Sequence, residues 1–144
     1  MSRSLRILVV ENHGDTLLYM RRYLEQLGHV VRTATSLADA GTALGKELPD
    51  VLISDIGLPD GEGWELPRSL PAHAGVFAIA MSGYGSEADV RRSREAGFHR
   101  HLVKPFDPDD LDALLAEADR HCPAAIPGSP NIQSGPVART IDET

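Results

Sequence analysis

In this chain of 144 residues, four short apolar runs each end at or close to a polar side chain with reactive chemistry. Those side chains are Glu11, Asp55, Ser82 and Lys104. A single acid after a strand is more often a helix cap than a reactive group, but capping does not explain two acids, a hydroxyl and an amine at four such positions. Carboxylate oxygens suit Mg²⁺. A carboxylate beside Mg²⁺ and an ammonium group is a good acceptor for a phosphoryl group.

The elements that must position these groups are visible as apolar runs. Leu5–Val10, Asp50–Ser54 and Gly75–Ala80 are short and rich in β-forming residues, which predicts strands covered on both faces of a parallel sheet. Val30–Ala34 and Phe98–Val103 are interrupted by Arg or His, as expected of edge strands with one side toward solvent.

Helical periodicity fills the segments between the strands. Leu17, Met20, Leu24 and Leu27 are spaced to share one face of a helix that ends at Gly28. The next helices have recognisable starts.

Ser36 and Ser86 are expected N-caps, each followed three residues later by an acid. Residues 107–108, Asp-Pro, predict the start of the last helix. Pro67 falls in the second turn of the helix expected after Gly63, so that helix should be short or bent.

The alternation of five strands with five helices predicts right-handed crossovers and a three-layer α/β/α sandwich. With the three most apolar strands in the centre, the order 2-1-3-4-5 fits, which is the flavodoxin-like doubly wound parallel sheet. Sites in this topology lie at the carboxyl ends of the central strands, so the four polar side chains should meet there.

Composition favours one acidic domain without nucleic-acid or membrane partners. Lys and Arg number 14 against 21 Asp and Glu, a net charge of −7, which argues against direct nucleic-acid binding. The apolar runs fall far short of the roughly 20 residues of a membrane span. The N-terminus does not resemble a signal peptide, and Cys122 stands alone, so a cytoplasmic location is expected.

A change in composition after Cys122 marks the expected domain boundary. Residues 1–122 are predicted to fold as one domain. Residues 123–144 are rich in Pro and Gly and contain no aromatic residue, so they are predicted to form a flexible tail.

Four segments, in order along the chain, resemble the response-regulator receiver domain of two-component signalling. They are Leu5 to Glu11 (LRILVVE), Asp50 to Pro59 (DVLISDIGLP), Met81 to Gly83 (MSG) and Leu102 to Phe106 (LVKPF). The resemblance covers about residues 4–121 and is strongest to receivers of hybrid sensor kinases. It implies a phosphoprotein that is phosphorylated by a histidine kinase or histidine phosphotransfer protein, signals through a downstream protein and is not a turnover enzyme.

The resemblance also implies roles for individual residues. Asp55 would accept the phosphoryl group, and Lys104 would pair first with Asp55 and then with the phosphoryl oxygens. Ser82 would turn inward to hydrogen-bond the phosphoryl group. Pro105, which in this family commonly follows a cis bond, would aim Lys104 at the site.

The same resemblance places Mg²⁺ on Glu11, residue 12, Asp55 and the backbone carbonyl of Gly57. Receivers normally carry a second acid at the position of Asn12, so the amide removes one negative charge from the ion. Such losses cost on the order of 10–100-fold in metal affinity. Two outcomes stay open: weak Mg²⁺ binding with slow phosphorylation, or normal function through Glu11 and Asp55.

His101 stands where receivers usually carry an aromatic residue that swings inward when Ser or Thr engages the phosphoryl group. Imidazole is smaller and can be charged, so burying it is unfavourable unless it is neutral. One interpretation is a modified switch made of Ser82 and His101. The other, which the sequence slightly favours, is a solvent-facing histidine on an edge strand.

The remaining histidines show no ligand spacing and are not expected to bind a metal. They are at positions 13, 29, 73, 99 and 121. His13 falls near the pocket, but no nucleophile is evident with which it could pair.

The expected output surface consists of the fourth helix, the fifth strand and the fifth helix, and it is also the candidate surface for a homodimer. Two other functions compete. A pseudo-receiver that works without phosphorylation is made credible by Asn12. A small hydrolase with an Asp nucleophile is disfavoured, because no acid lies two residues after Asp55.

Overall fold

A single parallel sheet organises the part of the chain that the computed structural model describes, residues 4–71, 75–83 and 87–121. Its strands are β1 (Arg6–Val10), β2 (Val30–Ala34), β3 (Val51–Asp55), β6 (Phe77–Ser82) and β7 (Arg100–Val103). Their order is β2-β1-β3-β6-β7, and every pairing is parallel. This is the predicted order 2-1-3-4-5, with β2 and β7 at the edges, so the doubly wound fold is confirmed.

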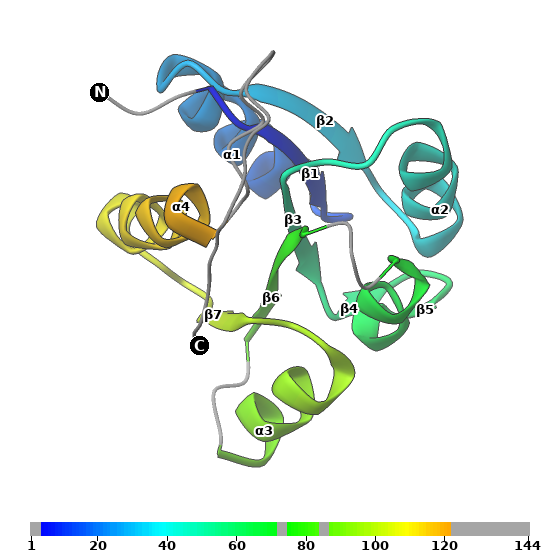
Figure 1. Cartoon of the computed structure of the whole chain (residues 1–144). Helices are drawn as coiled ribbons and strands as arrows, with labels where there is room; N and C mark the ends of the chain where they lie inside the picture. The colour runs from blue at the N-terminus through cyan, green and yellow to red at the C-terminus, as the bar shows by residue number, and fades with distance from the viewer. Residues whose placement is uncertain (1–3, 72–74, 84–86, 122–144) are drawn as a thin grey trace.

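Helices cover both faces of this sheet (Figure 1). The helices are α1 (Gly14–Gln26), α2 (Leu37–Lys46), α3 (Glu87–Ala96) and α4 (Pro108–His121). Side chains alternate between two hydrophobic cores along each strand: Ile7 and Val9 pack with α1 and α4, whereas Leu8 and Val10 pack with α2 and α3. The result is the predicted three-layer sandwich.

Several helix ends lie where the sequence placed them. Gly28 follows α1 with a φ of 96°, a conformation that favours glycine. The Ser36 hydroxyl accepts a hydrogen bond from the backbone N–H of Asp39 at 3.0 Å and caps α2. The last helix begins at Pro108. The cap expected at Ser86 and the tail expected over residues 123–144 lie outside the described residues.

The helix expected after Gly63 is not an α-helix. Two 3₁₀ turns, Gly63–Glu65 and Pro67–Ser69, occupy this stretch after a small hairpin of β4 (Gly57–Leu58) and β5 (Gly61–Glu62). Pro67 lacks a backbone N–H and its ring crowds the preceding turn, so a continuous helix cannot pass through it. The described residues therefore contain four α-helices, and the prediction of five is wrong on this point.

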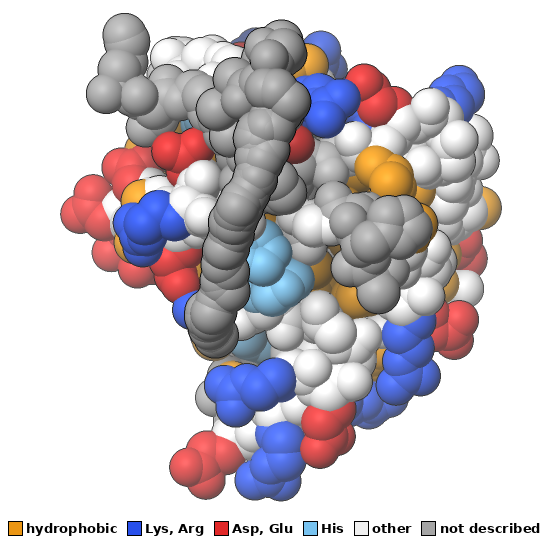
Figure 2. Space-filling view, in the orientation of Figure 1, with side chains coloured by type: hydrophobic (Ala, Val, Ile, Leu, Met, Phe, Trp, Pro, Cys, Tyr) orange, Lys and Arg blue, Asp and Glu red, His pale blue; other side chains and the backbone are white. Residues whose placement is uncertain are grey.

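His29 and His99 are partly buried and His121 is exposed, and all three lie away from the candidate site. Histidine side chains, coloured pale blue, gather on the face that Figure 2 shows. The Nδ1 atoms of His29 and His99 accept hydrogen bonds from the backbone N–H groups of Leu5 and Ala78, both at 3.0 Å. The ring of His121 lies 4.6 Å from that of His99. Burial lowers the pKa of all three imidazoles, and nearby cations lower those of His99 and His121 further.

We expect this group to make the fold sensitive to mild acid. A histidine whose pKa is lowered in the folded state binds a proton more weakly there than in the unfolded chain. It does not affect the free energy of unfolding above its ordinary pKa of about 6.5, and the fold loses stability as the pH falls below that value. The urea midpoint should therefore drop between pH 7.5 and pH 5.5. The urea midpoint of His99→Asn, whose amide oxygen can accept the hydrogen bond from the Ala78 N–H, should drop less over the same pH range. An equal drop in both proteins would contradict this assignment.

Candidate functional site

Two carboxylates meet at the carboxyl ends of the central strands. Val10 on β1 lies opposite Ser54 on β3 in a parallel register. The residues that follow them, Glu11 directly after β1 and Asp55 at the end of β3, therefore lie close together. Glu11 is 0% exposed and Asp55 is 6% exposed. Two buried acids side by side need compensation by a cation, because unpaired buried charge is costly.

Lys104 supplies a cation to both acids. It directly follows β7 and precedes Pro105 across a cis peptide bond, as the sequence led us to expect. Its ammonium Nζ donates to Glu11 Oε1 at 2.6 Å and to Asp55 Oδ2 at 3.1 Å. Lys104 thus bridges two strand ends that are 93 and 49 residues away from it in the chain.

Burial and mutual contact shift the pKa values of Asp55, Glu11 and Lys104 in different directions. Burial raises the pKa of Asp55 and the negative charge of Glu11 adds to this, which outweighs the hydrogen bond from Lys104. Burial would also raise the pKa of Glu11, but hydrogen bonds from Lys104 and His13 overcome it, so that pKa is lowered. Burial opposes charge on Lys104, yet its two acceptors raise its pKa. Asp55 is therefore the more basic carboxylate of the two.

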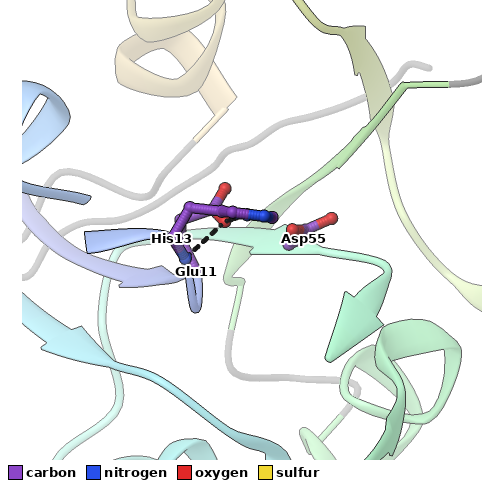
Figure 3. A group of neighbouring side chains, drawn as sticks. All are labelled: Glu11, His13 and Asp55. Atoms are coloured by element: carbon purple, nitrogen blue, oxygen red, sulfur yellow. Dashed lines mark hydrogen bonds and ion pairs between the residues drawn. The ribbon is translucent and has the colours of Figure 1, made fainter. Parts of the chain in front are cut away.

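His13, which the sequence placed near the pocket without assigning it a role, contacts this pair of acids. Its ring Nδ1 lies 2.9 Å from Glu11 Oε2, and its backbone N–H donates to the same oxygen at 3.0 Å. Glu11, His13 and Asp55 each offer a ligand atom, and these atoms lie within 4.8 Å of one another. Figure 3 shows the ring of His13 directed toward Asp55. His13 thus stands in a group of side chains that could hold a metal ion, which the spacing of the histidines in the sequence did not indicate.

The other expected metal ligands lie next to these acids. Asn12 is exposed between Glu11 and His13, in the connection from β1 to α1. The backbone N–H of Gly57 donates to Asp55 Oδ1 at 3.3 Å, so the carbonyl of Gly57 belongs to the same turn. Two buried carboxylates with amide and carbonyl oxygens within two residues of them form a donor set that fits Mg²⁺.

Ser82, at the end of β6, is hydrogen-bonded to His101 on the neighbouring strand β7. Ser82 Oγ lies 2.9 Å from His101 Nε2, and Ser93 Oγ on α3 lies 2.6 Å from His101 Nδ1. The imidazole thus links a strand-end hydroxyl to a helix. The interpretation of His101 as a solvent-facing edge residue is wrong, because the ring is partly buried between two hydroxyl groups.

Comparison with known proteins gives this site its context. Residues 7–116 match the family described as the response regulator receiver domain, which is most of the chain. The chain belongs to this family, a signalling phosphoacceptor module of two-component systems. The pseudo-receiver alternative gains no support from these comparisons.

Relatives in the family range from small proteins to large sensors. A 14.6 kDa protein encoded in the sodA1 3′ region of Leptolyngbya boryana is 37% identical over 114 residues, which cover 77% of this chain and 87% of the relative. KdpE, the KDP operon transcriptional regulatory protein of Escherichia coli, is 32% identical, and the match covers 94% of this chain and 60% of KdpE. The virulence sensor protein BvgS of Bordetella pertussis is 36% identical; the match covers 98% of this chain but only 12% of BvgS.

Solved structures agree with the fold. A CheY-like receiver domain protein of Methanospirillum hungatei superimposes with a TM-score of 0.75 at 28% identity, over 83% of this chain and 97% of that one. A two-component response regulator from Clostridium difficile gives a TM-score of 0.76 at 20% identity, over 82% and 97%. Within the described residues, none of the helices has the length and apolar character needed to cross a bilayer.

Proposed function

We propose that this receiver accepts a phosphoryl group on Asp55 from the phosphohistidine of a histidine kinase or histidine phosphotransfer protein. One observation carries the proposal: Lys104 bridges Glu11 and Asp55 in a buried pocket at the carboxyl ends of β1 and β3. A basic carboxylate beside a fixed ammonium group can attack phosphorus while the ammonium neutralises the charge on the phosphoryl oxygens.

The transfer exchanges one bond to phosphorus for another. An oxygen of Asp55 forms the new O–P bond as the P–N bond of the donor breaks, and the electron pair of that bond leaves with the donor imidazole. Lys104 remains charged throughout and moves its contact from the Asp55 oxygen to the phosphoryl oxygens. Bound Mg²⁺ would neutralise further phosphoryl charge, held by Glu11, Asn12, Asp55 and the carbonyl of Gly57. The protein assists its own phosphorylation and is not a turnover enzyme.

The signal then passes through Ser82 and His101, which form the modified switch. The hydroxyl of Ser82 is hydrogen-bonded to His101 in this structure, and His101 is hydrogen-bonded to Ser93 of α3. When Ser82 turns to the phosphoryl group, His101 loses its hydrogen bond to Ser82. The hydrogen bond between His101 and Ser93 then passes any movement of the imidazole to α3. The buried residues of α3 are Ser93 and Ala96, both small, so its packing is easily biased.

Output is through protein contacts on the surface formed by α3, β7 and α4. Val103 on β7 is a large apolar side chain that is exposed there. A downstream protein or a second copy of the chain can dock on this surface. The net charge of −7 favours a protein partner over nucleic acid. The cytoplasmic location expected from the sequence remains part of this proposal.

The proposal is tested with a small phosphodonor. Incubation of the full chain with acetyl phosphate and Mg²⁺ should give one acid-stable, base-labile phosphoryl group, detected as a mass increase of intact protein. Asp55→Ala should give none. Asp50→Ala, which changes an acid at the other end of β3, should be labelled like the parent chain.

Other results would identify a different function. Absence of the adduct, with a cognate kinase as well as with acetyl phosphate, would favour the pseudo-receiver that acts as an interaction module. Continuous hydrolysis of an organic phosphate without a stable adduct would favour the hydrolase.

Asn12→Asp should strengthen Mg²⁺ binding and speed phosphorylation. The substitution returns a negative charge beside Glu11, and changes in the support of a metal site alter affinity by about 10–100-fold. Isothermal titration of the unphosphorylated protein with Mg²⁺ measures this directly. An unchanged dissociation constant would show that Asn12 does not limit the site, and that Glu11 and Asp55 suffice.

A further inference from the structure

We infer that His13 is a direct ligand of the metal site and that its imidazole shifts the site's preference from Mg²⁺ toward the transition-metal cations Mn²⁺, Co²⁺ and Zn²⁺. This inference rests on the proposed function, because it concerns the same pocket. It adds a ligand that the receiver resemblance did not supply and a class of cation that an all-oxygen site would not select.

The geometry places the imidazole inside the donor group. The ligand atoms of Glu11, His13 and Asp55 lie within 4.8 Å of one another, a separation that one cation can bridge. The ring of His13 points toward Asp55 rather than away from the pocket (Figure 3). The side chain is nevertheless 71% exposed, so solvent and ions can reach it.

The backbone holds the arrangement together independently of the ring. The N–H of His13 donates to Glu11 Oε2 at 3.0 Å, and the carbonyl of His13 accepts from the N–H of Leu17 at 2.9 Å, in the first turn of α1. Neither bond uses the imidazole. Removing the ring therefore removes a candidate ligand and the contact of its Nδ1 with Glu11 Oε2, but it leaves the main-chain hydrogen bond that orients Glu11.

The chemistry of the donor set then decides the cation. Mg²⁺ prefers oxygen ligands in a nearly ideal octahedron, so a nitrogen ligand adds little to its binding. Imidazole suits transition metals, whose affinities rise along the series from Mn²⁺ toward Cu²⁺. Asn12 has already removed one negative charge from the oxygen set. Two carboxylates and one imidazole form a mixed set that discriminates against Mg²⁺.

The test is a comparison of metals in matched variants of the full, unphosphorylated chain. Isothermal titrations with Mg²⁺ and Co²⁺ are made on the parent protein, His13→Ala and the control His121→Ala, which removes an exposed imidazole outside this group. Loss of a ligand should weaken Co²⁺ binding by about 10–100-fold in His13→Ala. Because Mg²⁺ gains little from nitrogen, its affinity should change by less than about 3-fold. His121→Ala should match the parent protein for both metals.

A spectroscopic readout separates direct ligation from support of Glu11. Pulsed electron paramagnetic resonance of the Mn²⁺ complex should show coupling to an imidazole nitrogen in the parent protein and His121→Ala, and none in His13→Ala. Equal losses for Mg²⁺ and Co²⁺, absence of the nitrogen coupling in the parent, or no Co²⁺ binding at all would each overturn the inference.

These measurements need no phosphodonor, so the two proposals fail separately. A protein that binds Co²⁺ through His13 but is never phosphorylated on Asp55 would refute the proposed function and leave the metal site standing. A protein that is phosphorylated with Mg²⁺ but shows no effect of His13 on metal binding would refute only the inference about His13.

Discussion

Lys104→Met should abolish efficient phosphorylation and also destabilise the unphosphorylated fold. The ammonium group is the charge that faces both Glu11 and Asp55. Removing one preorganised electrostatic group costs about 100–1,000-fold in rate in other active sites. Removing one partner of a buried ion pair costs about 3–5 kcal/mol of stability, because the remaining charge stays buried without compensation. Acetyl phosphate labelling and urea unfolding in EDTA measure the two effects.

The pH dependence of the Lys104 variant identifies the cause. Burial already raises the pKa of Asp55 above its ordinary value, and loss of the hydrogen bond from Lys104 raises that pKa further. A group of that kind gains folded-state stability as the pH falls, since protonation removes the buried charge. The destabilisation should therefore be largest near neutral pH and shrink toward acid. A stability loss that does not change with pH would point to lost packing instead.

Lys46→Met is the matched control, since it makes the same chemical change at an exposed position at the end of α2. Surface substitutions of this type change stability within about 0.5 kcal/mol. Labelling of Asp55 should also be normal. A comparable defect in Lys46→Met would mean that loss of net positive charge, rather than the bridge at Lys104, explains both effects.

The fold could be predicted from the sequence because its strands and helix ends carry local signals. The buried strands are continuous apolar runs, and Ser36, Gly28 and Pro108 mark helix boundaries through their own backbone chemistry. The stretch between β3 and β6 lacked such a signal. Pro67 indicated where a helix must break, but not that two 3₁₀ turns and a hairpin would replace it.

Leu27, at the end of the predicted apolar face of α1, is also exposed, because the helix ends there.

The candidate site was predictable to the extent that topology alone positions it. Parallel strands bring their carboxyl ends to one edge of the sheet, which places Glu11, Asp55 and Lys104 within reach of one another. His13 and His101 depend on rotamers and on the path of a loop, which follow no periodicity. The position of His13 two residues after Glu11 was the one available signal. Spacing rules for histidine ligands missed it, because its partners are carboxylates on two different elements.

Gly63→Ala should displace the backbone of Asp55, although Gly63 itself has no side chain in the site. A Cβ at this position would lie 2.6 Å from the backbone carbonyl oxygen of Asp55 and 3.1 Å from Ser54 Oγ. The backbone N–H of Gly63 also donates to the carbonyl of Ile56 at 2.7 Å, which holds the hairpin close under β3. The clash is with main chain at the end of a central strand, so a side-chain rotation cannot relieve it.

The expected cost of Gly63→Ala is about 1–3 kcal/mol of stability, the usual range for an overpacked core. Moving Asp55 by about 1 Å can also slow transfer by about 100-fold. Gly57→Ala is the control: it lies two residues after Asp55, keeps the carbonyl proposed for Mg²⁺, and its Cβ would meet nothing within 4 Å. Urea midpoints and acetyl phosphate labelling should fall in Gly63→Ala and stay near the parent values in Gly57→Ala. If both variants behaved alike, the close packing of the hairpin under Asp55 would not be what fixes the phosphoacceptor.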